Sequence, residues 1–362
     1  MKIAQIAPLC ERVPPPAYGG TEIVVSLLTD ELVRRGHEVT LFASADSQTL
    51  AHLEPSCPQA LRMLGASPAE ISVYQSRQLD RVFAQAAEFD LIHSHIGELV
   101  FPYANLVETP TLHTVHGIIP PHIEQLWLNA RHQNFISISH SQRRNDLQLN
   151  YVDTVYNGID TRRYPFYAQP DNPPYLAFLG RMSPEKGPHL AIEIAKRTGW
   201  NLKMAGKIDP VDRRFFEEEI EPLIDGEQIE FLGEANHQQK CPLMGGAVAT
   251  LFPITWNEPF GLVMAESMAV GTPLIAMAMG STPEVIEAGK TGFLCRSVEE
   301  CIVALDRIGE IDRFACRDRV VDQFSVERMV DDYEAVYQML VQQSRLNHRV
   351  PNFVADENRL SA

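Results

Sequence analysis

Residues 258–266 read EPFGLVMAE, and the stretch places two glutamates eight positions apart with a Phe-Gly pair between them. Pro259 disfavours helical geometry at the preceding residue, so Glu258 is expected in a loop. A helix is expected to begin at Gly261 and to carry Glu266 about one and a half turns in. The two carboxylates therefore have different positions, and we expect them to have different roles.

The beginning of this helix is a candidate anion site. The amides of Gly261, Leu262 and Val263 would be first-turn donors without partners in the helix, and with the helix dipole they carry about half a positive charge. A diphosphate could rest on them, with Glu266 beside a ribose and Glu258 reaching a sugar on the other side. Taken alone, the acids would be a loop acid and a solvated helix residue, but the apolar neighbours of Glu266 indicate a mostly buried helix.

The second half of the chain alternates strand-like apolar runs with helical patterns. Strands are expected at residues 175–180, 202–205, 229–232, 247–252 and 274–276. Helical patterns fill the gaps, including 188–198 and 262–270. Alternation of this kind predicts an α/β fold with a parallel sheet covered by helices on both faces.

The first half has the same organisation. It opens with an apolar run at residues 3–7 and a proline-rich loop, CERVPPPAYGG. A helical pattern follows from Thr21 to Arg35, with Thr21 as the expected N-cap and Gly36 closing the helix. Further strands are expected at residues 39–43, 91–93, 111–115, 135–138 and 154–156.

The length of 362 residues exceeds what one hydrophobic core usually organises, so two domains with a ligand cleft between them are expected. The polar segment FYAQPDNPP at 166–174 interrupts the alternation and marks the linker. We therefore expect an N-terminal domain over residues 1–165 and a second domain over 166–324. An amphipathic helix over 325–347 should pack across their junction, followed by a loose tail over 348–362.

Glycines follow the first expected strand, at the place where ligands bind in open α/β sheets. Gly19 and Gly20 precede a helix, so their bare amides and the positive helix end are suited to a phosphate. The spacing is not GxGxxG, which argues against a dinucleotide-binding fingerprint. A glycine pair after three prolines is, on its own, more often simple turn chemistry.

Two cations follow the first strand of the second half, in FLGRMSPEKG. Arg181 offers a fixed fork of donors and Lys186 a point charge, a combination suited to two neighbouring phosphates. The alternative is a solvated surface pair. Their place at a strand end favours the phosphate interpretation.

Histidines end a strand of the first half, in LHTVHG. Strand alternation puts His113 and His116 on opposite faces, so only one of them points into a cleft. His116 is the better candidate because it lies nearer the carboxyl end of the strand. A single strand histidine is more often only hydrogen-bonded in place.

Composition excludes several classes of protein. The formal net charge of −16 disfavours nucleic-acid binding and allows at most peripheral membrane contact. Six scattered cysteines form no CxxC pair and no metal-ligand spacing, so free thiols in a reducing compartment are expected. The first residues do not have the pattern of a signal peptide, and no run approaches the roughly 18 apolar residues that span a bilayer. A cytoplasmic protein is expected.

Together these stretches resemble the retaining glycosyltransferases of family four, which have the GT-B fold of two Rossmann-like domains facing a cleft. The resemblance covers nearly the whole chain. It rests on the Gly19-Gly20 loop, TVHG, VYNGID at 155–160, GRMSPEKG at 180–187, and EPFGLVMAE. The Glu, seven residues, Glu pattern of the last element is the most specific.

The resemblance implies a role for each candidate residue. Gly19 and Gly20 amides, with the Arg181 and Lys186 side chains, would bind the diphosphate of a nucleotide sugar. The nucleotide-sugar-binding set as a whole is Gly19, Gly20, Arg181, Lys186, Glu258, Phe260, Gly261, Leu262 and Glu266.

In that set Glu266 would hold the ribose. Glu258, with the amides of Phe260 and Gly261, would hold hydroxyls of the transferred sugar, and His116 would face that sugar from the other domain. The catalytic set would be His116, Glu258, Arg181 and Lys186. The family's fold also implies that the C-terminal helix returns to the first domain.

No Asp-x-Asp pair, which holds a divalent ion in many other glycosyltransferases, occurs in the sequence. We therefore expect a hexosyltransferase that needs neither metal nor cofactor, because Arg181, Lys186 and the helix start at Gly261 would stabilise the leaving diphosphate. Retention of anomeric configuration is implied by the resemblance alone. The donor is expected to be a UDP-sugar, with a GDP-sugar possible, and the acceptor a glycan, a lipid or a small molecule.

Two departures from the family leave base and sugar identity open. A second glycine often follows the position of Gly280, where this chain reads GSTPE, and CPLMGGAVATLFP departs from the usual tyrosine-containing helix. Alternatives of the same architecture are a nucleotide-sugar epimerase and a sugar phosphorylase. A further alternative is a non-catalytic nucleotide-sugar-binding protein. A nicotinamide-dependent oxidoreductase is disfavoured because the GxGxxG loop is missing.

Overall fold

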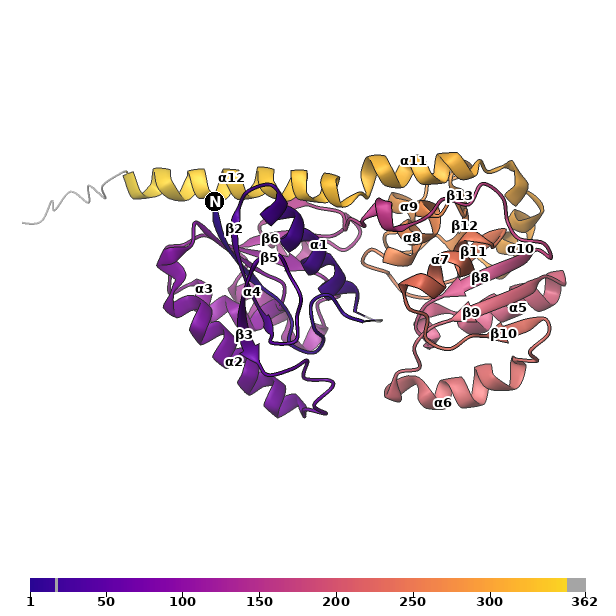
Figure 1. The fold of residues 1–362 in the computed structure, drawn as a ribbon, viewed down its shortest axis with the longest axis horizontal. Helices are drawn as coiled ribbons and strands as arrows, with labels where there is room; N and C mark the ends of the chain where they lie inside the picture. Colours follow the sequence, from indigo (N-terminus) through magenta and orange to yellow (C-terminus); the bar gives the residue numbers. More distant parts are fainter. Residues whose placement is uncertain (17–18, 350–362) are drawn as a thin grey trace, which may run out of the picture.

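The structure is a computed structural model that describes residues 1–16 and 19–349. Two parallel sheets flanked by helices lie next to each other, and the long helix α12 (Val326–Arg349) runs along the N-terminal one (Figure 1). The α/β architecture predicted from the alternation is confirmed. The predicted domain boundary at residue 165 falls between the last strand of the first sheet and the first strand of the second.

The first sheet contains seven strands, all paired in parallel, in the order β3-β2-β1-β4-β5-β6-β7. Their bounds are β1 Lys2–Ile6, β2 Glu38–Ser44, β3 His52–Cys57, β4 Leu91–Ser94, β5 Thr111–Val115, β6 Asn134–Ser137 and β7 Tyr151–Thr154. The strand expected at 154–156 begins three residues earlier and shares only Thr154 with β7, while Val155 packs into the core beside α12. The edge strand β3 was not predicted.

The helices of the first half are α1 Gly20–Arg34, α2 Pro68–Ala84, α3 Phe101–Ala104 and α4 Glu124–Asn129. The prediction that Thr21 caps α1 is wrong, because the helix begins one residue earlier and Gly19 is its N-cap. Gly19 has φ 147°, and a Cβ there would lie 2.8 Å from the ring of Pro15, so glycine is required. Gly19 has no side chain that could cap α1, so this N-cap residue leaves first-turn amides available to a ligand.

The second sheet contains six parallel strands in the order β10-β9-β8-β11-β12-β13. Their bounds are β8 Tyr175–Leu179, β9 Asn201–Ala205, β10 Ile229–Phe231, β11 Ala249–Phe252, β12 Leu274–Met277 and β13 Gly292–Cys295. The helices are α5 Pro188–Thr198, α6 Arg213–Phe215, α7 His237–Gly245, α8 Leu262–Ala269, α9 Thr282–Val285, α10 Val298–Asp306 and α11 Arg313–Gln323. β13 was not predicted, because it is short and begins with glycine.

Strand order reverses once in each sheet, between β1 and β4 in the first and between β8 and β11 in the second. Loops that leave the carboxyl ends of strands at such a reversal diverge and open a crevice. The loop with Gly19 and Gly20 follows β1, and the loop with Arg181 and Lys186 follows β8. The topology therefore places both candidate phosphate loops at crevices.

Helix α12 packs against α1 and the first sheet. Its buried side chains share one core with those of α1; they are Val326, Met329, Val330, Tyr333, Val336, Tyr337, Leu340 and Val341. Burying each large apolar side chain of this kind contributes about 1.5–3 kcal/mol relative to exposure. The helix ends at Arg349, so it includes the first two residues of the predicted tail, and residues 350–362 lie outside the described residues.

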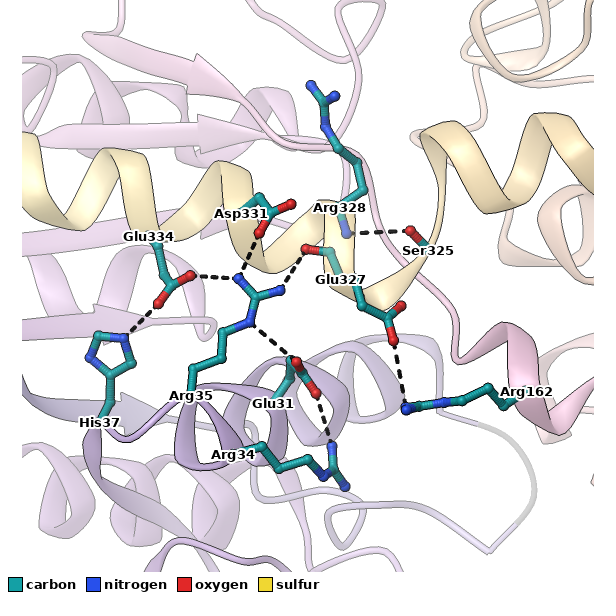
Figure 2. Close-up of polar contacts among 10 residues, drawn as sticks. All are labelled: Glu31, Arg34, Arg35, His37, Arg162, Ser325, Glu327, Arg328, Asp331 and Glu334. Carbon is teal, nitrogen blue, oxygen red and sulfur yellow. Dashed lines mark hydrogen bonds and ion pairs between the residues drawn. The ribbon is translucent and has the colours of Figure 1, made fainter.

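A charged cluster fastens α12 to the end of α1 (Figure 2). Arg35 donates to Glu31 at 3.2 Å, Asp331 at 2.7 Å, Glu334 at 2.5 Å and the main-chain oxygen of residue 327 at 3.0 Å. His37 is 2.7 Å from the other carboxylate oxygen of Glu334. Because three of these partners lie on α12, one guanidinium links the C-terminal end of α1 to three positions along the long helix.

Among the described residues, no helix combines the length and the apolar character that crossing a bilayer requires.

Candidate functional site

A cavity of about 420 Å³ lies between the two halves, and every site residue predicted from the sequence lines it. These residues are Gly19, Gly20, His116, Arg181, Lys186, Glu258, Phe260, Gly261, Leu262 and Glu266. They come from the loops after β1, β5, β8 and β11 and from the helices α1 and α8 that two of these loops lead into. The structure thus brings the whole predicted set together, while the role of each residue stays a prediction.

Two helix N-termini meet in this cavity. Gly20 begins α1, and a Cβ built there would lie 3.6 Å from the Cδ1 atom of Leu262, the first residue of α8. Gly261 is the N-cap of α8, with φ 76° and no side-chain cap. Both helix ends therefore present uncapped amides and positive dipole ends to the same space, which suits a ligand with two negatively charged groups.

The cations of the cavity are each held by carboxylates in this structure, which the sequence did not indicate. Arg181 pairs with Glu185, and its Nε atom lies 3.5 Å from a carboxylate oxygen of Asp212. Lys186 pairs with Glu258 and lies 4.8 Å above the ring of Trp256. The ion pairs hold the cations at the cavity wall, and an entering diphosphate would compete with the carboxylates for them.

Glu258 is the buried centre of the loop after β11, as only 7% of its surface is exposed. Its carboxylate accepts hydrogen bonds from Lys186 and, at 3.0 Å, from the indole nitrogen of Trp256. Its main-chain oxygen accepts a 2.9 Å hydrogen bond from the amide of Ser281, whose hydroxyl donates to the oxygen of Phe260 at 2.8 Å. Ser281 thus fixes the loop that carries Glu258.

Glu266 is also buried, with 4% of its surface exposed, so it is not a solvated helix residue. Its Oε1 atom accepts hydrogen bonds from the hydroxyl of Tyr164 at 2.9 Å and from Lys240. The structure records no partner among the described residues for its Oε2 atom, which is therefore available to accept from a ligand hydroxyl.

His116 lines the cavity, whereas His113 packs between the rings of Phe101 and Phe135, with centroids 5.2 Å and 5.4 Å away. Burial lowers the pKa of His116 to about 4 and that of His113 to about 3. Both imidazoles are therefore neutral near pH 7. The Nε2 atom of His116 lies 2.8 Å from the Nδ1 atom of His95.

Sequence reasoning missed several residues of the cavity wall. Lys207 and Lys240 add positive charge, and Trp256 supplies an aromatic face. Asn157, from VYNGID, is 5% exposed, and its side-chain oxygen has no partner among the described residues. The motif VYNGID was part of the resemblance, but nothing in the sequence pattern assigned a role to Asn157.

All six cysteines are free, as expected. Within residues 1–16 and 19–349, no group of three or more His, Cys, Asp or Glu side chains is arranged to hold a metal ion. That sugar transfer needs no metal ion stays a prediction, because a metal ion could also enter together with the substrate.

Two family models together cover most of the chain. Residues 18–163 match the model described as Glycosyltransferase Family 4, and residues 163–308 match Glycosyl transferases group 1. The chain therefore belongs to the glycosyltransferases of these families, and its two sheets form the GT-B fold that the resemblance implied.

Curated and solved relatives agree with this assignment. Glycogen synthase of Mycobacterium tuberculosis (strain CDC 1551 / Oshkosh) is 25% identical, over 78% of this chain and 80% of its own. Sucrose-phosphate synthase from Thermosynechococcus elongatus superposes with a TM-score of 0.77 at 19% identity, covering 94% of this chain and 99% of that one. Anabaena Alr3699/HepE, solved in complex with UDP and glucose, has a TM-score of 0.71 at 18% identity, covering 94% and 100%. At these identities the solved structures support the fold alone.

Proposed function

We propose that this glycosyltransferase is a retaining, metal-independent hexosyltransferase that takes its sugar from a nucleoside diphosphate sugar. The observation that carries the proposal is the convergence of Arg181, Lys186 and the uncapped starts of α1 and α8 on one cavity. Breaking a glycosyl phosphate bond leaves negative charge on the departing diphosphate, and this cavity offers stabilisation for it.

The diphosphate would bind to the cations by replacing part of their carboxylate contacts. Arg181 would exchange Glu185 for a phosphate oxygen, and Lys186 would bridge a phosphate and Glu258. Each charge-assisted hydrogen bond contributes roughly 1.5–3 kcal/mol, and amides at the two helix starts add to it. The amides at the two helix starts are already in place, whereas the two cations would exchange carboxylate contacts for phosphate contacts when the diphosphate binds.

The sugar would lie between Glu258, the amides of Phe260 and Gly261, and His116 from the opposite half. No residue at this position is an evident covalent nucleophile. We therefore propose attack from the face that the diphosphate leaves: the anomeric carbon–phosphate oxygen bond breaks and the bond to the acceptor oxygen forms. Because attack and departure take place on the same face, the anomeric configuration is retained. The acceptor proton passes to the departing phosphate oxygen, so the protein gains no proton.

The ribose hydroxyls would donate hydrogen bonds to the Oε2 atom of Glu266, because Oε1 already accepts from Tyr164 and Lys240. A UDP-sugar is the favoured donor, with a GDP-sugar as the alternative, and the UDP bound to Anabaena Alr3699/HepE supports this choice through the shared fold. The acceptor would be a glycan, a lipid-linked saccharide or a small molecule, with at most peripheral membrane contact. The free thiols support a cytoplasmic location.

Thermal-shift measurements with UDP-, GDP- and ADP-sugars test the donor, because a ligand that binds only the folded state raises the melting temperature. We expect a UDP-sugar to give the largest shift and to release UDP slowly by hydrolysis without acceptor. An interconverted nucleotide sugar would identify an epimerase, and a released sugar phosphate would identify a phosphorylase. Binding without any hydrolysis would support the non-catalytic alternative.

Arg181→Ala and Lys186→Ala should each abolish this hydrolysis while leaving the folded structure intact. Lys196→Ala is a matched control, since Lys196 is exposed on α5, the helix that follows the same loop. Wild-type rates in both cavity variants would contradict the assignment of the phosphate site.

A further inference from the structure

A chain of buried hydrogen bonds leads from His116 into the first half of the protein. The Nε2 atom of His116 lies 2.8 Å from Nδ1 of His95, and Nε2 of His95 lies 2.9 Å from Oε1 of Gln5. The amide nitrogen of Gln5 donates to the hydroxyl of Tyr337 at 3.2 Å. Gln5 is on β1, His95 follows β4, and Tyr337 is on α12, so three separate elements hold this chain.

The chain continues beyond Tyr337. Its hydroxyl lies 2.7 Å from Nδ1 of His93, whose Nε2 atom lies 2.8 Å from the hydroxyl of Thr114, and that hydroxyl is 2.9 Å from Tyr333. The side chains beyond His116 are all less than 5% exposed, so bulk water does not compete for these bonds.

The chain has a direction, because a carboxamide oxygen only accepts. The Oε1 atom of Gln5 must therefore accept a hydrogen bond that Nε2 of His95 donates. A neutral imidazole has one N–H, so Nδ1 of His95 is an acceptor and Nε2 of His116 carries the proton. Burial lowers the pKa of His95, which is consistent with a neutral ring.

The far side of Gln5 has the same direction. Its amide nitrogen donates to Tyr337, which leaves the tyrosine hydroxyl to donate to Nδ1 of His93. His93 then donates from Nε2 to Thr114. Every donor meets an acceptor along these bonds with Gln5 in this orientation, and turning its amide over would reverse the direction of every bond.

We propose that Gln5 and His95 are positioning residues that hold His116 in the Nε2–H tautomer, with its Nδ1 atom as a hydrogen-bond acceptor for a hydroxyl of the transferred sugar. The inference rests on the proposed function only for the identity of that hydroxyl. Among the described residues, no hydrogen bond is recorded at Nδ1 of His116, and the residue lines the cavity. The ring nitrogen that is not used by His95 is thus the one left for a ligand.

The tautomer is measured directly by nitrogen NMR on protein labelled with 15N-histidine, without substrate. The signals of His116 are assigned by their loss in His116→Asn. We expect a protonated Nε2 and an unprotonated Nδ1 in the wild type. Gln5→Met removes both polar atoms of the side chain, and we expect it to give a mixture of the two tautomers at His116. A protonated Nδ1 in the wild type, or an unchanged tautomer in Gln5→Met, would overturn the proposal.

Two further variants, each of which removes a single hydroxyl, test the proposal if Gln5→Met does not fold. Tyr337→Phe removes the hydroxyl that orients Gln5, whereas Tyr333→Phe removes a hydroxyl of the same helix that meets only Thr114. We expect Tyr337→Phe to weaken the preference for the Nε2–H tautomer and Tyr333→Phe to preserve it. Equal effects of the two would show that the chain does not set the tautomer.

The kinetic readout separates this inference from the proposed function. In Gln5→Met, kcat for transfer should fall about tenfold, the effect of one lost hydrogen bond, while the affinity for the free nucleoside diphosphate stays unchanged. Gln5→Glu, whose carboxylate still accepts from His95, should restore the tautomer and part of kcat. If the protein transfers no sugar, the proposed function fails, but the tautomer experiment still decides the role of Gln5 and His95.

Discussion

Acidification should destabilise the folded protein well before its carboxylates titrate, because histidines are buried in neutral form. Burial lowers the pKa of His116 to about 4 and that of His113 to about 3, from an ordinary value of 6.5. Between pH 6.5 and these values the unfolded chain binds protons that the folded chain does not, so the free energy of unfolding falls as pH falls. The contribution of these histidines to the free energy of unfolding is fully present above pH 6.5. It falls with pH and stops falling below their pKa values in the folded state.

The magnitude follows from the pH interval. At pH 5, one and a half pH units below 6.5, His113 costs about 2 kcal/mol at about 1.4 kcal/mol per pH unit. His116 acts in the same direction but adds less, because it is partly exposed to the cavity and solvent screens its charge. Burial lowers the pKa values of His93 and His95 as well, and these act in the same direction.

Urea denaturation followed by tryptophan fluorescence at pH 7, 6 and 5 measures this loss. His113→Phe keeps a ring between Phe101 and Phe135 and should make the decline between pH 7 and pH 5 smaller by about 2 kcal/mol. His122→Gln removes an exposed histidine and should leave the decline as in the wild type. A decline that is equally steep in His113→Phe, or no decline in the wild type, would show that the buried neutral histidines do not set the acid sensitivity.

Three further outcomes are expected. Glu266→Gln should weaken binding of the nucleoside diphosphate, and unchanged affinity by calorimetry would count against the ribose role. Arg35→Met should lower the free energy of unfolding by roughly 1–3 kcal/mol, a range reduced for partial exposure, since it removes hydrogen bonds to three carboxylates and a carbonyl. Arg34→Met removes only the exposed pair with Glu31 and should cost less than about 1 kcal/mol in urea denaturation, and an equal loss in both would contradict the role of the cluster. Transfer should persist after EDTA treatment, and activity that returns only with added divalent metal would show that the cations do not suffice.

Much of the fold could be predicted because the apolar runs are long and bounded by breakers. Helix α5 has the predicted bounds, and α8 differs by one residue, since glycines precede and follow these helical patterns. Strands β3 and β13 were not predicted, because their sequences lack the usual pattern of a buried strand. β3 carries proline and glutamate at a sheet edge, where apolar character is not required, and β13 has only four residues.

The site residues could be located from the sequence because parallel sheets collect strand-end loops at one edge. Their partners could not, since long-range contacts leave no local pattern. Lys240 meets Glu266 from a different helix, and His95 meets His116 from a neighbouring strand end. The ion pair between Lys186 and Glu258 joins positions 72 residues apart. The sequence predicted Arg181 and Lys186 as two cations of the site. The structure shows that each of them forms an ion pair with a carboxylate, Glu185 and Glu258 respectively.

The most direct test of the proposed phosphate site is a crystal structure of the protein with the nucleoside diphosphate that stabilises it best. We expect a diphosphate in contact with Arg181, Lys186 and the amides that begin α8 at Gly261. A diphosphate bound away from these groups, elsewhere in the cleft or on the surface, would contradict the proposed site.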